Sequence, residues 1–285
     1  MATSKPLVSI IMNCYNSDRF LKEAIDTVYD QSYQNWELIF WDNASNDQSS
    51  TIARSYDDKV KCFRSEKTTI LGEARHQAVK KVKGKYLAFL DCDDLWMKSK
   101  LENQVNIFLE SDNNLALVYG RSEIISDQKR QNSHFPKYNQ TLYQGNIFKY
   151  LCEGNFIPFV SAMVDKEKFH ECGGFSKDIK HSTDYVLFLK LANKYEVKAM
   201  DGVHCKYRMH EGNLTKKLRV TAAEECITAL ETFLPNQDAK SGIKHHKLNL
   251  AIAYLNNKKY LHSLTTVFKY NLFGLLFNRL IRKMS

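Results

Sequence analysis

The stretch Tyr86-Leu87-Ala88-Phe89-Leu90-Asp91-Cys92-Asp93-Asp94 is the strongest indication of how this chain folds. Its five apolar residues have the length and composition of a strand that is buried on both faces. Three carboxylates follow at once, at the carboxyl end of the strand, where open α/β sheets bind their ligands. Asp91 and Asp93 are two positions apart, so an extended backbone directs both side chains to one side. Such a cluster favours a divalent cation, although a solvated acidic turn before a helix has the same composition.

Strand and helix patterns alternate through the first hundred residues. Val8–Met12, Glu37–Trp41 and Val60–Phe63 are typical of strands, and residues with helical spacing separate them. This alternation predicts an α/β fold: a doubly wound, mostly parallel central sheet with helices on both faces. The polar segments Asn13–Asn16 and Asp42–Asp47 end two of the strands, so we expect them to join the acidic turn on one rim.

No glycine-rich phosphate loop accompanies this rim, because neither GxGxxG nor GxxxxGK[ST] occurs in the chain. A bound diphosphate would therefore need a metal ion and basic side chains. Arg75, at the start of an expected helix over residues 72–83, is well placed for that purpose. The first half of the chain thus predicts a nucleotide-binding unit.

The second half continues with shorter elements and ends in helices. We expect a strand at Leu115–Tyr119, a hairpin or mobile loop over residues 120–145, and a helix beginning at Asp184. Further strands are expected at Phe159–Val164, Val197–Met200 and His204–Met209, and helices at Ala222–Phe233, Ile243–Leu255 and Tyr260–Ile281. These elements predict a domain over residues 1–215, with a nucleotide-binding half (1–115) and an acceptor-binding half (116–215). A helical extension over residues 216–285 follows.

The net charge of +9 is concentrated in that extension. The first 238 residues carry 32 basic and 32 acidic side chains, whereas nine Lys and Arg residues and no Asp or Glu follow Asp238. Such a tail favours contact with an anionic membrane surface or with a nucleic acid. The seven Cys residues have no regular spacing, and no apolar run is long enough for a signal or a membrane span, so we expect a cytoplasmic protein.

Over roughly residues 6–215 the chain resembles the family 2 inverting glycosyltransferases, which have the GT-A fold. Each matching motif is short, but their order and spacing extend over two hundred residues. The motifs are Val8–Met12 with Tyr15-Asn16, Gln31–Ile39, Asp42–Asp47, Gly72–Arg75, Phe89–Trp96, Lys100–Glu102, Gly173–Phe175, Thr183–Tyr185 and Tyr207–His210. The resemblance implies transfer of a hexose from a nucleotide sugar, with UDP as the expected nucleotide, to a glycan or lipid-linked glycan acceptor.

The resemblance also implies roles for individual residues. Asp93, with Asp91 and His210 as further ligands, would bind Mn²⁺ or Mg²⁺ in a DxD motif, and Asp91 would otherwise contact the ribose. Asp184 would be the general base, although an Asp at a helix start is by itself more often a cap. The nucleotide would be framed by residues at three places: Cys14, Tyr15 and Asn16, then Asp42, then Arg75. A structural role for His210 is an equal alternative.

Some motif residues depart from the family pattern. Asn13-Cys14 replaces the usual Pro-Thr, and Asn43-Ala44 replaces Asp-Gly, so the second carboxylate of an Asp-Asp pair is missing. The DxD positions and Asp184 are retained. The chain is therefore expected to be an active enzyme.

The extension leaves several partners open. Its last expected helix suits the inner face of an anionic membrane. Packing on the catalytic domain or on a second subunit in a homodimer is slightly favoured, because amphipathic helices usually bury their apolar stripe in protein. A nucleic-acid-binding protein and a nucleotidyltransferase are the alternative functions. Neither is favoured, because no recognised nucleic-acid motif and no second metal-binding carboxylate group is found. We expect no nucleic acid partner.

Overall fold

The computed structural model describes residues 5–126, 133–137, 140–213 and 219–274. Its first half is the expected strand–helix alternation. The strands are β1 (Val8–Cys14), β2 (Trp36–Asp42), β3 (Val60–Arg64) and β4 (Tyr86–Phe89), which lie side by side in the order β3-β2-β1-β4 and run parallel. The strands β1, β2 and β4 are buried almost throughout, as their apolar runs predicted.

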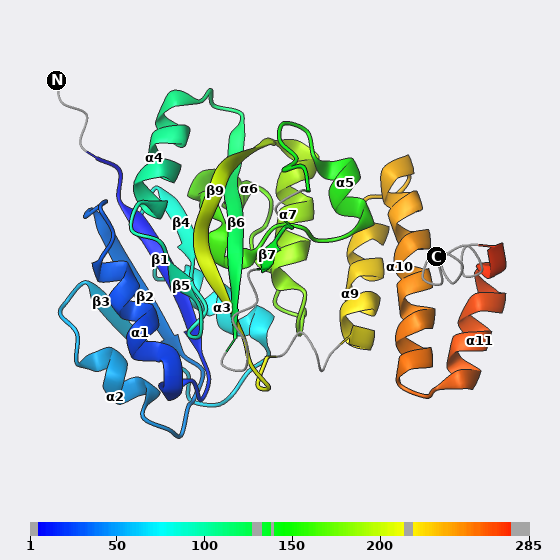
Figure 1. The fold of residues 1–285 in the computed structure, drawn as a ribbon, viewed down its shortest axis with the longest axis horizontal. Coiled ribbons are helices and arrows are strands. Elements are labelled where there is room, and N and C mark those ends of the chain that lie inside the picture. The colour runs from blue at the N-terminus through cyan, green and yellow to red at the C-terminus, as the bar shows by residue number, and fades with distance from the viewer. Residues whose placement is uncertain (1–4, 127–132, 138–139, 214–218, 275–285) are drawn as a thin grey trace.

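Helices cover both faces of this sheet (Figure 1). Helices α1 (Asp18–Tyr29), α2 (Ser49–Arg54) and α4 (Lys100–Glu110) contribute to one buried apolar cluster. The other face packs against α3 (Leu71–Val79), α5 (Phe148–Glu153), α6 (Lys166–Glu171) and α7 (Thr183–Lys194). Alternate residues of β1 and β4 enter the two clusters, because successive side chains of a strand point to opposite faces. The expected α/β fold is confirmed.

The second half of the sheet adds antiparallel pairs, so the sheet is mixed rather than purely parallel. Strand β8 (Met163–Asp165) lies antiparallel to β4 and to β6 (Leu115–Ser126), and β9 (Glu196–Met209) then runs parallel to β6. The expected hairpin after residue 120 is present in the described residues, where β7 (Ser133–Phe135) pairs antiparallel with β6. Strand β9 joins the two separate strands that the sequence predicted, and its pairing with β6 is irregular near Gly202.

Strand β5 (Leu95–Trp96) fixes the place of the acidic turn. It pairs antiparallel with β9, Leu95 opposite Lys206 and Trp96 opposite Cys205. Because β5 follows the acidic turn directly, this pairing brings residues 91–94 beside the end of β9 and the loop that follows it. The prediction of a strand at Phe159–Val164 is wrong for the first half of that segment. Phe159–Ser161 instead form a 3-10 turn after Pro158.

Glycines allow two close approaches of the backbone. A Cβ atom on Gly72 would lie 2.4 Å from the carbonyl oxygen of Ser176 and 2.5 Å from that of Ile179. The first turn of α3 can therefore pack directly on the loop before α7. Gly174 has φ +54° and faces the ring of Phe169, so a side chain there would be strained and would clash.

The extension contains α9 (Arg219–Glu231), α10 (Gln237–Asn256) and α11 (Tyr260–Lys269). Cys226 and Leu230 of α9 and Ile243 of α10 join the apolar cluster under α7, so the extension shares the core of the α/β domain. The expected helix Tyr260–Ile281 is too long, because α11 ends at Lys269 and the backbone turns at Asn271 with φ +51°. Residues 275–281 of that expected helix lie outside the described residues. In the described part of the chain, no helix is long and apolar enough to cross a membrane.

Candidate active site

A cleft of about 1020 Å³ lies at the carboxyl ends of β1 and β4. It brings together most of the residues that the sequence analysis singled out. From that set its walls include Cys14, Tyr15, Asn16, Arg75, Asp91, Asp93, Asp184 and His210. The predicted convergence of strand-end polar residues is therefore present in the structure.

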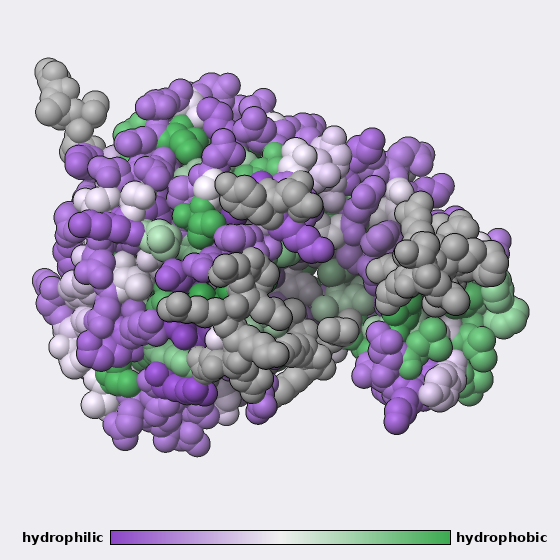
Figure 2. Space-filling model, viewed as in Figure 1, coloured by the Kyte–Doolittle hydropathy of each residue, from purple (hydrophilic) through white to green (hydrophobic). Residues whose placement is uncertain are grey.

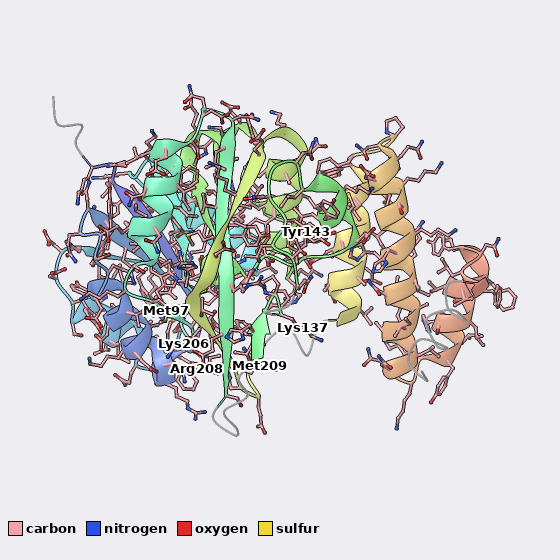
Figure 3. All side chains as sticks on the ribbon, turned by 45° about the horizontal axis from the view of Figure 1, so that its top comes forward. Met97, Lys137, Tyr143, Lys206, Arg208 and Met209 are labelled. Atoms are coloured by element: carbon pink, nitrogen blue, oxygen red, sulfur yellow. The ribbon has the colours of Figure 1, made fainter. Side chains whose placement is uncertain are left out.

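The acidic turn and His210 meet on one side of the cleft. His210 Nε2 lies 2.8 Å from Asp93 Oδ2. Asp94 is buried, and its Oδ1 accepts a hydrogen bond of 2.8 Å from the backbone N–H of Arg208. The Arg208 side chain donates in turn to the backbone oxygen of Asp93, at 2.9 Å. Figure 3 shows Arg208 and Met209 at the end of β9, next to Lys206.

Arg75 joins three elements at the wall of the cleft. Its guanidinium donates to the Thr183 hydroxyl at the start of α7, and NH2 lies 3.4 Å from Asp91 Oδ1. The ring of Phe159 stacks against it, 3.8 Å from the guanidinium carbon. Removal from solvent raises the pKa of Asp91 to about 6; Arg75 opposes this rise, and repulsion from Asp93 and Asp184 adds to it. The carboxylates here are thus only partly neutralised by protein groups.

The segment after β1 forms the rim beside the acidic turn, where the Cys92 thiol donates to the backbone oxygen of Asn13 at 3.4 Å. Tyr15 is 53% exposed and Asn16 has φ +49°, and both line the cleft together with the buried Cys14. The backbone N–H of Asn16 donates to the Ser45 hydroxyl at 3.0 Å, which ties the rim to the loop after β2. The side-chain nitrogen of Asn13 is buried at the base of the rim and has no hydrogen-bond partner among the described residues.

Asp42 does not face the cleft as expected. Its carboxylate is 1% exposed, accepts from the backbone N–H of Ser45 at 2.8 Å and pairs with Arg64. Asn43, the next residue, lines the cleft instead. The correction follows from strand geometry, because neighbouring side chains point to opposite sides of β2 and only one of the two can face a ligand.

Asp184 lies on the first turn of α7 and lines the cleft. Its Oδ2 accepts a hydrogen bond of 2.9 Å from the side chain of Asn155. Ser182, rather than Asp184, occupies the cap position of α7, and no side-chain hydrogen bond caps the helix. The structure therefore gives no support to a capping role for Asp184.

Glu225 of α9 holds the chain just before Asp184. Its carboxylate accepts from three successive backbone N–H groups, those of Lys180 at 2.6 Å, His181 at 3.1 Å and Ser182 at 2.8 Å. On the next helix, His246 Nε2 of α10 lies 3.1 Å from the hydroxyl of Tyr185. The extension thus fixes both sides of the Asp184 position.

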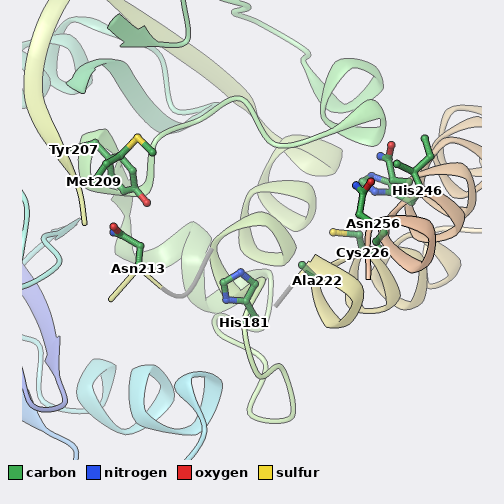
Figure 4. Close-up of a pocket in the computed structure, with 12 residues that line it drawn as sticks. His181, Tyr207, Met209, Asn213, Ala222, Cys226, His246 and Asn256 are labelled. Carbon is green, nitrogen blue, oxygen red and sulfur yellow. The ribbon is translucent and has the colours of Figure 1, made fainter. Parts of the chain in front are cut away.

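A second cavity of about 530 Å³ adjoins the cleft. The two share five lining residues, His181, Tyr207, Asn213, Ala222 and Cys226. Figure 4 shows His181 between the end of β9 and the helices α9 and α10. Its Nδ1 atom is buried and has no hydrogen-bond partner among the described residues.

The donor set fits a hard divalent cation that is shared with a substrate. Carboxylate oxygens suit both Mn²⁺ and Mg²⁺, whereas an imidazole nitrogen suits a transition metal such as Mn²⁺ better than Mg²⁺. One group of each kind is present here, at Asp93 and His210. Within the described residues, no three His, Cys, Asp or Glu side chains converge closely enough to hold a metal by themselves. Mg²⁺ commonly uses one or two carboxylates and completes its shell with phosphate oxygens and water, so these residues fit an ion held together with a diphosphate.

Several residues of this site were missed by the sequence analysis. Asn155 and Glu225 stand in no motif, so no signal in the chain identifies them. Asn43 was noted only as a departure from the family pattern. Arg208 lies within the Tyr207–His210 motif, so the motif was a signal for its hydrogen bonds to Asp93 and Asp94.

Comparison with known proteins agrees with this geometry. Residues 9–173 match the model of Glycosyl transferase family 2. An uncharacterized glycosyltransferase of Rickettsia felis is 31% identical over 84% of this chain, which spans 40% of that protein's length. The Escherichia coli UDP-Glc:alpha-D-GlcNAc-diphosphoundecaprenol beta-1,3-glucosyltransferase WfgD is 30% identical over 89% of this chain and 98% of its own length.

Among solved structures, the mannosyltransferase PcManGT of Pyrobaculum calidifontis in complex with GDP-Man and Mn²⁺ shares the fold. The TM-score is 0.64 at 16% identity, over 98% of this chain and 86% of that one. This likeness supports the architecture, and the family model matches residues 9–173, which include the acidic turn. The chain belongs to glycosyl transferase family 2.

Proposed function

We propose that the protein transfers a sugar from a UDP-sugar to a hydroxyl group of a glycan or lipid-linked glycan, with inversion at the anomeric carbon. The observation that carries this proposal is one cleft that holds an acidic strand end, His210 and a separate carboxylate, Asp184. The family places the chain among the glycosyltransferases. The relative WfgD is named for a UDP-Glc donor, which supports UDP as the nucleotide.

The proposed donor site lies between the Tyr15 rim and the acidic turn. The exposed ring of Tyr15 offers an apolar surface for the base. The side-chain nitrogen of Asn13, which has no partner among the described residues, offers a polar contact, whereas the amide of Asn43 is already bonded to Thr69. Asp42 would act indirectly, because its bonds to Arg64 and Ser45 hold the loop after β2 in place.

Asp93 and His210 would hold Mn²⁺ or Mg²⁺ against the diphosphate, with Asp91 at the ribose or the metal. When bound, the ion supplies positive charge to the departing phosphate oxygens. PcManGT was solved in complex with GDP-Man and Mn²⁺, which supports a metal in this fold. Arg208 and Asp94 would keep Asp93 oriented toward His210 through the bonds described above.

Asp184 would be the general base. In a single displacement the acceptor oxygen forms a bond to the anomeric carbon, the bond to the phosphate oxygen breaks, and the acceptor proton moves to Asp184. Asn155 orients the carboxylate through its bond to Oδ2, at 2.9 Å. Inversion follows because acceptor and leaving group occupy opposite faces of the sugar.

The acceptor would approach from the His181 side, where the second cavity adjoins the cleft. WfgD is named for an N-acetylglucosamine diphosphoundecaprenol acceptor, and this name supports a lipid-linked acceptor for the present chain. Arg75, which lines the cleft and contacts Thr183 and Asp91, would instead place positive charge beside the nucleotide diphosphate.

The test is a thermal-shift panel of nucleoside diphosphates, each with and without Mn²⁺. A ligand that binds only the folded protein raises its stability by about 2.7 kcal/mol at a hundred times its dissociation constant. We expect UDP with Mn²⁺ to raise the melting temperature, and Asp93→Ala to remove that rise. Asp58→Ala, at an exposed turn before β3, is the matched control and should leave the rise unchanged.

Product analysis then tests the reaction itself. Incubation with UDP-glucose and a short-chain alkyl ester of N-acetylglucosamine diphosphate should yield a β-linked product from the α-linked donor. A product that retains the α configuration would overturn the single-displacement proposal. Absence of stabilisation by every nucleoside diphosphate, with or without Mn²⁺, would overturn the donor site.

A further inference from the structure

Helix α11 presents an apolar face to solvent. Tyr260, Leu261, Leu264 and Phe268 are 60%, 72%, 52% and 68% exposed. At about 100° per residue these four side chains fall within an arc of roughly 100° on one side of the helix. Phe273, just beyond the helix, is also exposed and packs edge-on against Phe268 with ring centroids 4.7 Å apart.

The opposite side of α11 attaches it to α10. The hydroxyl of Ser263 donates to the backbone oxygen of Ala251 at 2.9 Å. Val267 and Leu272 pack with Ala251 in a small separate cluster. The exposed face therefore has no part in holding the described helices together. Amphipathic helices in soluble proteins usually bury their apolar stripe, whereas α11 exposes this one to solvent.

Basic residues frame this face. Lys258 and Lys259 are exposed just before α11, and Lys269 is exposed at its last turn. No acidic residue follows Asp238 in the sequence, so no carboxylate of this segment offsets these charges. Figure 2 shows apolar residues gathered at the end of the molecule where Figure 1 places α11.

We propose that this α11 face docks on an anionic phospholipid surface. Helices that lie in the membrane interface combine an exposed apolar face with lysines or arginines at its edge. Each such charge adds attraction to anionic headgroups, and the apolar residues enter the headgroup region. The protein would thus attach to the membrane through α11 and keep its cleft in water. This proposal is independent of the reaction proposed above.

The charge favours lipid over a second copy of the chain. If two copies paired through this face, the lysines of both would be brought together without acidic partners in the segment. Like charges facing each other across an interface oppose association. An anionic membrane instead neutralises the same residues.

Co-sedimentation of the full chain with vesicles tests the proposal. We expect binding to vesicles of equal parts phosphatidylcholine and phosphatidylglycerol, and weak binding to phosphatidylcholine alone. The combined variant Leu261→Ser, Leu264→Ser, Phe268→Ser should reduce partitioning about tenfold or more. Its matched control is His262→Ser with Thr265→Ser, two exposed positions of α11 outside the apolar arc, which should bind like the unmodified chain.

Two further measurements keep the outcomes separate. Circular dichroism should show the same helix content in all variants, since every altered side chain is exposed. Light scattering should show no change of mass between the unmodified chain and the serine variant. Equal binding to both vesicle types, or unchanged binding of the serine variant, would overturn the proposal. A dimer that the serine variant dissociates, without vesicle binding, would make a second copy the partner. Failure of the nucleotide assays would leave the vesicle result intact.

Discussion

His210 Nε2 lies 2.8 Å from Asp93 Oδ2, although 117 positions separate the two residues in the chain. The pairing of β5 with β9 produces this contact, because it places the acidic turn beside the end of β9. The backbone of Arg208 and the carboxylate of Asp94 fix the same junction. One short strand pair thus assembles the proposed metal-binding side of the cleft.

Replacement of the proposed base should separate chemistry from donor binding. Asp184→Asn keeps the size of the side chain and removes its ability to accept a proton. We expect the turnover number to fall about a hundredfold to ten-thousandfold, with stabilisation by UDP and Mn²⁺ unchanged. Asp178→Asn, an exposed carboxylate in the loop before α7, is the control. A variant with normal turnover would show that another group takes the proton.

Glu225 should affect turnover only by holding Asp184 in position. Glu225→Gln weakens three bonds to the backbone before Asp184, and Glu225→Ala removes them. A misplacement of about 1 Å at a reacting group can cost roughly a hundredfold in rate. We expect the alanine variant to lose more turnover than the glutamine variant, while the Michaelis constant for the donor stays the same in both.

Glu224 gives the matched control for this prediction. It is the preceding residue of α9, and its Oε1 accepts from the Tyr254 hydroxyl at 3.1 Å, away from the cleft. Glu224→Gln should leave turnover unchanged. If both glutamine variants lost activity equally, through a common loss of stability, the positioning role of Glu225 would be refuted.

Lys100 should make stability depend on pH above neutrality. Its side chain is fully buried, donates to Gln104 at 2.7 Å and lies over the Trp96 ring. Burial lowers the pKa of Lys100 from 10.5 to about 7. Between these two values the unfolded chain binds a proton that the folded chain does not. The free energy of unfolding should therefore rise with pH in this window, by up to about 1.4 kcal/mol per pH unit.

Urea denaturation at pH 7 and pH 9 measures this contribution. Lys100→Met should abolish the part of the rise that Lys100 supplies, whereas Lys98→Met, at an exposed neighbouring position, should retain it. An equal pH response in the Lys100→Met variant and the unmodified chain would mean that the buried amine stays charged.

Gly72 should be intolerant of any side chain. The Cβ of Gly72→Ala would meet backbone oxygens of Ser176 and Ile179, which cannot move aside as a flexible side chain could. We expect a loss of about 1–3 kcal/mol in the free energy of unfolding. Gly274→Ala, whose Cβ would meet nothing within 4 Å, is the control. Thermal denaturation showing the same stability for both variants would refute the close approach.

The amino-acid sequence was sufficient to predict the α/β fold and most of the cleft. Buried strands such as Tyr86–Phe89 appear as continuous apolar runs, and the polar residues that follow them are local signals of a strand end. The motifs around Asp91, Asp184 and His210 indicated the family. The division of the chain at residue 215 stays a prediction.

Only the folded chain shows which of these residues meet and which way they face. No local pattern distinguishes Asp42 from Asn43, because the sheet beneath them sets the direction of each side chain. The same holds for Glu225 and Asn155, which reach the Asp184 position from distant helices and loops. Helix α11 has an apolar face that the sequence shows, but packing on α10 turns that face toward solvent. Local periodicity fixes the elements, whereas contacts between residues far apart in the chain depend on how the whole core packs.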